Sequence, residues 1–147
     1  MHWLLPPVLW AALLLAMVAQ WRWFPLYKPL GGAWHLIGFA PIAVGFAIMF
    51  FSAWQFRRVR TNIRTFDRPR VLVTDGTFAR TRNPMYLGFT LSLFGFAILF
   101  NDIGGVLLTA VFFIVADRWY VPFEERAAQA AFGEEYDRYR QHVPRWL

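Results

Sequence analysis

The chain has 147 residues, of which 58% are hydrophobic, 20% are aromatic and only 16% are charged. A soluble domain averages about one quarter charged residues, and a core of this size is too small to bury so many aromatic side chains. The composition therefore excludes an ordinary soluble globule and predicts an integral membrane protein. The absence of cysteine also excludes disulfides, thiolate metal sites and a cysteine nucleophile.

Two long apolar runs near the N-terminus predict the first two membrane-spanning helices. Residues 3–19 and 33–56 are uncharged runs of 17 and 24 residues, which is long enough to cross a membrane. A cleaved signal peptide is the alternative interpretation of the first run. It is disfavoured because no Lys or Arg precedes the run and because its end lacks a small-x-small cleavage pattern.

Two shorter apolar runs, residues 87–100 and 103–116, predict a helical hairpin because only two residues separate them. Fourteen helical residues span about 21 Å, which is less than the hydrocarbon core of about 30 Å. Each helix must therefore draw its flanking polar residues into the membrane. Because the connecting turn is tight, residues 82–86 and 117–125 are expected to face one another at the same edge of the membrane.

The distribution of positive charge predicts the orientation of these helices. Residues 57–84 hold eight arginines and residues 117–147 hold five, whereas only Arg22 and Lys28 lie between the first two runs. Segments rich in Lys and Arg stay in the cytoplasm. We therefore expect an all-α integral membrane protein with four transmembrane helices and a C-terminal amphipathic helical tail. The two termini and the paired polar clusters are expected to be cytoplasmic.

Nucleic acid and metal ions are not expected as ligands. The net charge of +6 arises largely from the basic stretch 57–70, which favours contact with anionic lipid head groups, with steering of an anionic substrate as the alternative. Nucleic-acid binding would require interleaved aromatic residues, and this stretch contains only Phe66. The three histidines, His2, His35 and His142, are too far apart for a local metal site.

The residues after the fourth run predict two short helices. Pro122 suits the start of one helix, and Gly133 suits a break before the next. An apolar stripe then follows helical spacing, formed by Phe132, Tyr136, Tyr139 and Val143. Two interpretations stay open: a lid over a bound ligand, or an amphipathic helix lying on the membrane interface.

The two polar clusters indicate either a functional site or an ion pair that staples the hairpin. In the second interpretation Arg82 or Arg118 would pair with Glu124 or Asp117. The adjacent Glu124 and Glu125 are more than one staple needs, which favours a site. Three uncharged polar side chains lie in the same two segments: Asn83, Tyr86 and Tyr120.

The sequence TDGTFARTRNPMYLG at residues 74–88, followed by EER at 124–126, FGEEY at 132–136 and Tyr139, resembles the integral membrane methyltransferase superfamily. That superfamily includes isoprenylcysteine carboxyl methyltransferases and phospholipid N-methyltransferases. The similarity covers residues 70–147, whereas residues 1–69 match only in being two hydrophobic spans with a basic loop. Many relatives have His where this chain has Asn83. Unlike His, Asn cannot take up a proton near neutral pH, so no acid–base role is expected for Asn83.

The resemblance implies S-adenosylmethionine as the methyl donor, bound between the C-terminal hairpin and the tail, which together form residues 70–147. The whole chain, 1–147, is expected to be a single membrane domain. This ligand offers a carboxylate, an ammonium, a sulfonium and an adenine, which require a fork-shaped cation, a carboxylate and an apolar slot. The expected contacts are Arg82 or Arg126 for the methionyl carboxylate, Glu124 and Glu125 for the ammonium or ribose hydroxyls, Asn83 and Tyr86 for the adenosyl end, and Pro84 and Gly88 for the start of the third helix.

The resemblance further implies methyl transfer to a lipid-like amphiphile that enters from the bilayer. The acceptor is either an isoprenylcysteine-type carboxylate or a phospholipid amine. A carboxylate needs no base, whereas an amine must lose a proton, for which Glu125, Tyr86 or water would serve. This difference slightly favours an anionic acceptor. The alternatives are an NADPH-dependent membrane reductase related to sterol reductases and a non-catalytic lipid-binding membrane protein.

Overall fold

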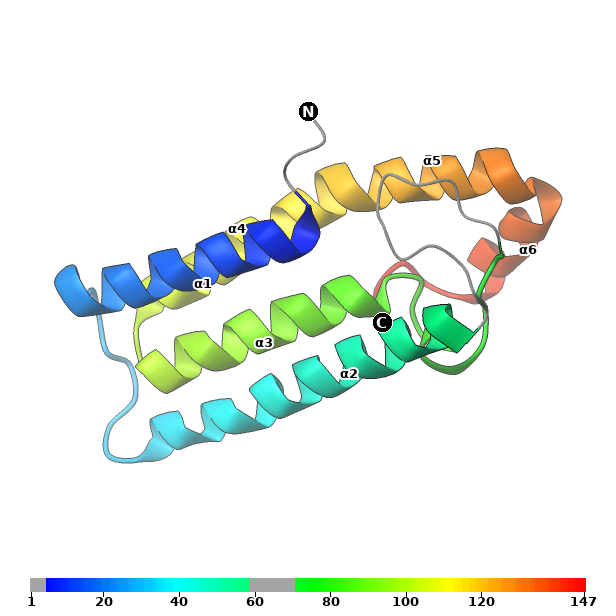
Figure 1. Ribbon diagram of the computed structural model, residues 1–147. Coiled ribbons are helices and arrows are strands. Elements are labelled where there is room, and N and C mark those ends of the chain that lie inside the picture. Colours follow the sequence, from blue (N-terminus) through cyan, green and yellow to red (C-terminus); the bar gives the residue numbers. More distant parts are fainter. Residues whose placement is uncertain (1–4, 59–70) are drawn as a thin grey trace.

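The computed structural model describes residues 5–58 and 71–147, and these residues form helices and turns with no strand among them. Four long helices lie side by side (Figure 1): α1 Pro6–Trp23, α2 Phe39–Arg58, α3 Pro84–Phe100 and α4 Ile103–Val115. The remaining elements are the 3₁₀ helices η1 Trp34–Gly38 and η2 Gly76–Ala79, the π-helical segment η3 Ala116–Tyr120, and the helices α5 Val121–Phe132 and α6 Glu134–His142. Most of the basic stretch 57–70 lies outside the described residues, so its interpretation stays a prediction.

Two continuous helices are long and apolar enough to cross a membrane, judged by length and composition. They cover Trp34–Arg58, which joins η1 to α2, and Ile103–Phe132, which joins α4, η3 and α5. Helix α3 is apolar but shorter. The all-helical prediction is therefore confirmed for the described residues, whereas the count of four spans stays a prediction.

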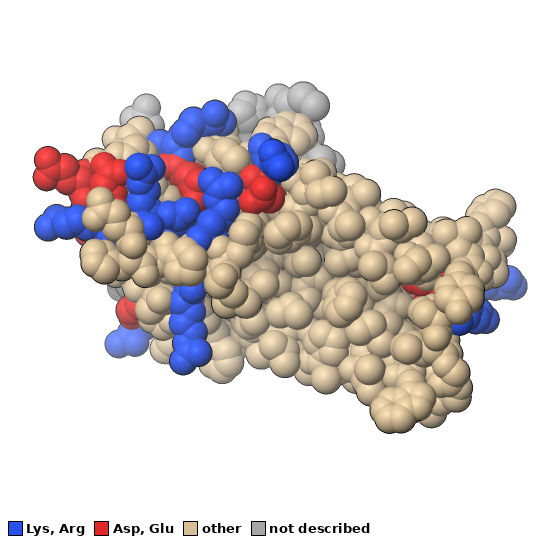
Figure 2. All heavy atoms as spheres, turned by 180° about the vertical axis from the view of Figure 1, so that it is seen from behind, with Lys and Arg blue, Asp and Glu red and all other residues tan. Residues whose placement is uncertain are grey.

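The surface of the molecule separates charged from apolar side chains. Figure 2 shows the charged side chains gathered mainly at the end formed by α5 and α6, with a few at the opposite end and an uncharged surface between them. Large apolar side chains are exposed on the long helices, for example Phe50 at 67% and Leu107 at 58%. An apolar band between two polar ends is the pattern expected of a protein in a bilayer.

The turn between α3 and α4 confirms the predicted hairpin. Asn101 adopts the left-handed conformation with φ 52°, and the Asp102 side chain caps α4 by accepting from the Gly104 amide at 2.8 Å. The same two side chains hold the loop between α1 and α2. Asp102 accepts from the Leu26 amide at 2.9 Å, and Asn101 exchanges two hydrogen bonds with the Leu30 backbone.

Helices α2 and α3 approach closely because glycines face one another across their interface. A Cβ added to Gly45 would lie 2.6 Å from the carbonyl oxygen of Gly88, and one added to Gly88 would lie 2.7 Å from that of Gly45. The pair Gly38 and Gly95 meets in the same way two helical turns along. Small residues of this kind let the backbones of membrane helices pack together.

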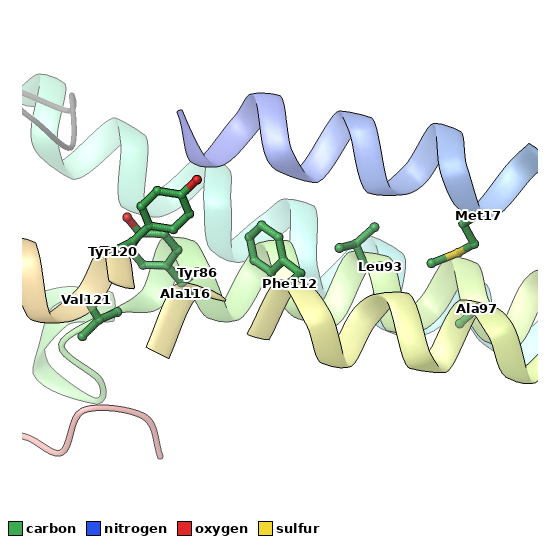
Figure 3. Close-up of a cluster of buried hydrophobic side chains, with 8 residues drawn as sticks. All are labelled: Met17, Tyr86, Leu93, Ala97, Phe112, Ala116, Tyr120 and Val121. Carbon is green, nitrogen blue, oxygen red and sulfur yellow. The ribbon is translucent and has the colours of Figure 1, made fainter. Parts of the chain in front are cut away.

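The core between α1, α3 and α4 fixes the direction of each helix. Met17, Leu93 and Phe112 are fully buried and follow one line along the bundle (Figure 3). The Trp10 indole near the start of α1 donates to the Ser92 hydroxyl within α3 at 3.0 Å. The Gln20 side chain near the end of α1 donates to Asp102, just after the end of α3, at 2.9 Å. Helices α1 and α3 therefore run in one direction and α2 and α4 in the other. This order brings residues 71–84 and 117–147 to the same end.

Candidate functional site

The start of α3 is set by the sequence Asn83-Pro84. Pro84 occupies the first turn, where its missing N–H removes no helical hydrogen bond, and it is fully buried. Asn83 precedes the helix, but its side chain does not cap it. The side-chain Nδ2 of Asn83 instead donates to the backbone carbonyl of Arg145 at 3.0 Å. Asn83, which was expected at the adenosyl end of the ligand, is thus directed toward the residues that follow α6, 143–147, which we call the tail from here on.

The two polar clusters predicted to face each other lie in contact across α3 and α5. The Arg82 guanidinium pairs with Glu125 at 2.9 Å, and the Tyr86 hydroxyl donates to Glu124 at 2.9 Å. The Arg82 side chain is 13% exposed and that of Glu125 is 20% exposed, so solvent screens this pair less than an exposed one. The tight hairpin therefore brings together residues that are about 40 positions apart, as the helix lengths predict.

The segment η3 lies between α4 and α5 within one uninterrupted helix. Pro122 stands in the first turn of α5, as predicted, but α5 continues the line of α4 (Figure 1). π-helical turns of this kind widen a helix and recur at functional sites. Here η3 contributes Asp117 and Tyr120, and the Tyr120 ring stacks on Tyr86 with centroids 5.9 Å apart and planes 11° apart.

Arg82 is also held by backbone carbonyls of α6 and of the tail. Its guanidinium donates to the carbonyl of Arg140 at 3.2 Å, and its amide donates to the carbonyl of Pro144 at 3.0 Å. The buried Nε of Arg82 has no hydrogen-bond partner among the residues that the structure describes. A buried donor of this kind is costly unless a partner satisfies it.

Two tail residues join the cluster without having been predicted there. The Arg145 guanidinium pairs with Glu125 at 2.6 Å and with Asp117 at 3.4 Å, and the Trp146 indole donates to Asp117 at 2.9 Å. The sequence contains no periodic signal for these contacts, because they require the chain after α6 to fold back across 20 residues or more. Asp117 was expected as a staple partner, and it also pairs with the exposed Arg118 at 3.4 Å.

Two of the expected binding residues lie away from this cluster. Gly88 faces α2, so the close approach that it permits is between two helices. Arg126 is exposed on α5, and no ion pair to it is found within residues 5–58 and 71–147. The buried start of α3, with Arg82 and Tyr86, and the acidic pair on α5 are therefore the residues that form the candidate site.

Helix α6 packs its predicted apolar stripe on the segment before η2. Gly133 has φ 52° and separates α5 from α6, as predicted. Tyr136, Tyr139 and Val143 are buried together against Leu72 and other residues. The Tyr139 hydroxyl donates to the carbonyl of Phe78 at 2.7 Å, and burial raises the pKa of Tyr139. The stripe thus faces the protein's own chain, and its service as a lid over a ligand stays a prediction.

Comparison with known proteins places the chain in a family. A family described as phospholipid methyltransferase matches residues 33–135, which include the α3 motif and the acidic pair on α5. The chain belongs to this family.

Two relatives accompany this match to the phospholipid methyltransferase family. The chain is 32% identical over 81 residues to a protein-S-isoprenylcysteine O-methyltransferase of Schizosaccharomyces pombe, covering 53% of this chain and 33% of the yeast protein. It is 33% identical over 63 residues to an uncharacterized protein of Haemophilus influenzae, covering 43% of this chain and 100% of that protein. The chain thus spans about one third of the length of the yeast relative. No solved structure matches it significantly.

Proposed function

We propose that this family member is an S-adenosylmethionine-dependent methyltransferase that acts at the membrane on a lipid-like amphiphile. The acceptor classes are an isoprenylcysteine-type carboxylate and a phospholipid amine. The observation that carries the proposal is the contact of the α3 motif with the acidic pair on α5, through Arg82 with Glu125 and Tyr86 with Glu124. The family match and the name of the yeast relative support the same reaction class.

The residues of the site fit the chemistry of the methyl donor. Arg82 offers a buried Nε that still requires an acceptor, which suits the methionyl carboxylate. Three carboxylates, those of Asp117, Glu124 and Glu125, lie in the cluster with the guanidinium groups of Arg82 and Arg145 and with the exposed guanidinium of Arg118. Carboxylates of this kind suit the ammonium and sulfonium groups of the ligand, and the guanidinium groups suit its one carboxylate. The stacked rings of Tyr86 and Tyr120 supply an apolar wall close to the same place.

When bound, S-adenosylmethionine supplies an electrophilic methyl group on a sulfonium that loses its charge as the methyl leaves. The residues of this chain align the acceptor with that methyl group and exclude water, because a site of low dielectric favours the loss of charge. The basic loop and Arg118 lie in the segments predicted to be cytoplasmic, so we place the site at the cytoplasmic face. The acceptor reaches it sideways from the bilayer.

The contacts distinguish the two glutamates as proton acceptors. Both carboxylate oxygens of Glu125 are paired with guanidinium groups, at 2.9 Å to Arg82 and 2.6 Å to Arg145, so an acceptor amine could reach Glu125 only by displacing one of these pairs. Glu124 instead accepts the hydroxyl hydrogen of Tyr86. For an amine acceptor we therefore assign the proton to the Tyr86–Glu124 pair rather than to Glu125, whereas a carboxylate acceptor requires no base.

Calorimetry of the full chain in detergent micelles tests this proposal. We expect S-adenosylhomocysteine to bind with micromolar affinity to the wild type and not measurably to Glu124→Ala. Tyr27→Phe serves as the control, because Tyr27 is exposed in the loop at the opposite end of the bundle. Binding of NADPH in place of S-adenosylhomocysteine would identify a reductase, and binding of neither would leave a non-catalytic lipid-binding protein.

Transfer of a labelled methyl group into a lipid extract then identifies the acceptor. Product in the amine-containing phospholipids would assign N-methylation, and base-labile product on a prenylated cysteine peptide would assign carboxyl methylation. No labelled product with either acceptor, from protein that binds the donor, would overturn the proposed reaction.

A further inference from the structure

The tail, residues 143–147, lies between the two halves of the candidate site. It stands beyond the range 33–135 that the family matches, so the family assignment does not account for its contacts. Its residues nevertheless touch the turn before α3 on one side and the α4–η3–α5 helix on the other.

The backbone of the tail holds the turn before α3. The Pro144 carbonyl accepts from the Arg82 amide at 3.0 Å. The Arg145 carbonyl accepts from the Thr81 hydroxyl at 3.0 Å and from the side-chain Nδ2 of Asn83 at 3.0 Å. Thr81 and Asn83 are 3% and 7% exposed, so these hydrogen bonds are protected from competing water. Three successive residues of the turn are thereby tied to two carbonyls of the tail.

The side chains of the tail hold the acidic residues on the other helix. Arg145 forms a fork with Glu125, through Nη2 at 2.6 Å and Nε at 3.3 Å, and reaches Asp117 at 3.4 Å. The Trp146 indole N–H donates to Asp117 at 2.9 Å, and the ring centroids of Trp146 and Phe113 lie 4.8 Å apart. The hydrogen bond with Glu125 raises the pKa of Arg145, so this guanidinium stays charged across the physiological range.

We propose that the tail is a latch in which Arg145 and Trp146 are positioning residues. The latch holds Glu125 and Asp117 at a set distance from the turn that carries Arg82, and so preorganises the site for its cofactor. The effect of the latch on cofactor affinity rests on the proposed methyltransferase function. The contacts themselves are independent of that function.

Cofactor affinity measures the effect of the latch. We expect Arg145→Gln to weaken binding of S-adenosylhomocysteine to the full chain in detergent about tenfold or more, as lost charged hydrogen bonds do. Arg145→Lys keeps the positive charge but not the forked geometry of the guanidinium, so it should lose less affinity than Arg145→Gln. The matched control is Arg138→Gln, which removes an exposed guanidinium from the neighbouring helix α6. In turnover, the KM for the methyl donor should rise more than kcat falls.

A shared latch also predicts that its members act together. Asp117→Asn combined with Arg145→Gln should lose less affinity than the sum of the two single losses, because the two residues share one contact. If Arg145→Gln fails to fold, Trp146→Phe removes only the indole donor to Asp117 and should still weaken binding. Wild-type affinity in Arg145→Gln or, where that variant does not fold, in Trp146→Phe would overturn the positioning role.

Proteolysis tests the contact without any ligand. We expect trypsin to cleave the Arg145–Trp146 bond slowly in the wild type and faster in Asp117→Asn, as followed by mass spectrometry of the intact chain. If the wild type binds no S-adenosylhomocysteine, the proposed function fails, and protection that depends on Asp117 still supports the latch contact. Equal cleavage of the wild type and Asp117→Asn would overturn that contact.

Discussion

Single side chains at this site are distinguished by their partners rather than by their residue type. Glu124 and Glu125 are adjacent and chemically identical, yet one accepts from a tyrosine hydroxyl and the other pairs with two arginines. Their separation follows from helical geometry, in which successive residues point about 100° apart. The same geometry lets each glutamate face a different element and take a different role.

Removal of the Tyr86 hydroxyl tests the proton assignment. With a phospholipid amine as acceptor, we expect Tyr86→Phe to lower kcat about 100-fold, the lower range for positioned proton transfer. With a carboxylate acceptor kcat should change little, because no proton must leave. Initial rates with saturating methyl donor give the answer, with Tyr27→Phe as control. Unchanged kcat for an amine acceptor would remove Tyr86 from the proton path.

Removal of the Tyr139 hydroxyl tests how α6 is fixed. Tyr139→Phe leaves the Phe78 carbonyl without this donor, which should destabilise the fold by about 1–3 kcal/mol at pH 7. Burial raises the pKa of Tyr139, so the folded chain keeps a proton that the unfolded chain loses above about pH 10. Wild-type stability should therefore fall as the pH rises above 10.

Detergent-solubilised protein unfolded at several pH values provides the measurement. The stability difference between wild type and Tyr139→Phe should be constant below about pH 9 and should shrink above pH 10. A difference that grows at alkaline pH would contradict the raised pKa.

Among the helices, the α2–α3 contact controls where the motif before α3 lies. Gly45→Ala places a Cβ 2.6 Å from the Gly88 carbonyl oxygen, and a backbone atom cannot move aside without separating the helices. We expect a loss of about 1–3 kcal/mol, typical of overpacking. Gly31→Ala is the control, because a Cβ at Gly31 meets nothing within 4 Å. Equal melting temperatures of the two variants would show that the interface tolerates separation.

For the complete chain, orientation in the membrane is the open prediction. The natural sequence has no cysteine, so a single introduced cysteine reports its side without background. Arg138→Cys on α6 and Lys28→Cys in the α1–α2 loop replace exposed residues near opposite ends of the bundle. In sealed inside-out vesicles a membrane-impermeant maleimide should label Arg138→Cys alone. Labelling of both cysteines from one side would contradict the predicted topology.

Much of the architecture follows from local properties of the amino-acid sequence. Apolar run lengths, the Asn101-Asp102 turn and the Gly133 break each depend on neighbouring residues, and the structure confirms the turn and the break. The meeting of residues 82–86 with 117–125 also follows, because two helices joined by a tight turn must align their far ends. The distribution of Lys and Arg along the sequence likewise predicts that positive charge gathers on one side, and Figure 2 shows the charged side chains mainly at one end.

Other features depend on contacts between distant segments and have no local signal. Gly88 faces α2 because of how two helices rotate about each other, and Asn83 turns to the tail because a carbonyl lies there. Arg145 and Trp146 join the acidic cluster only after α6 reverses the chain and carries them back over η3. Such pairings are set by the packing of the entire bundle, which the order of residues along the chain does not reveal.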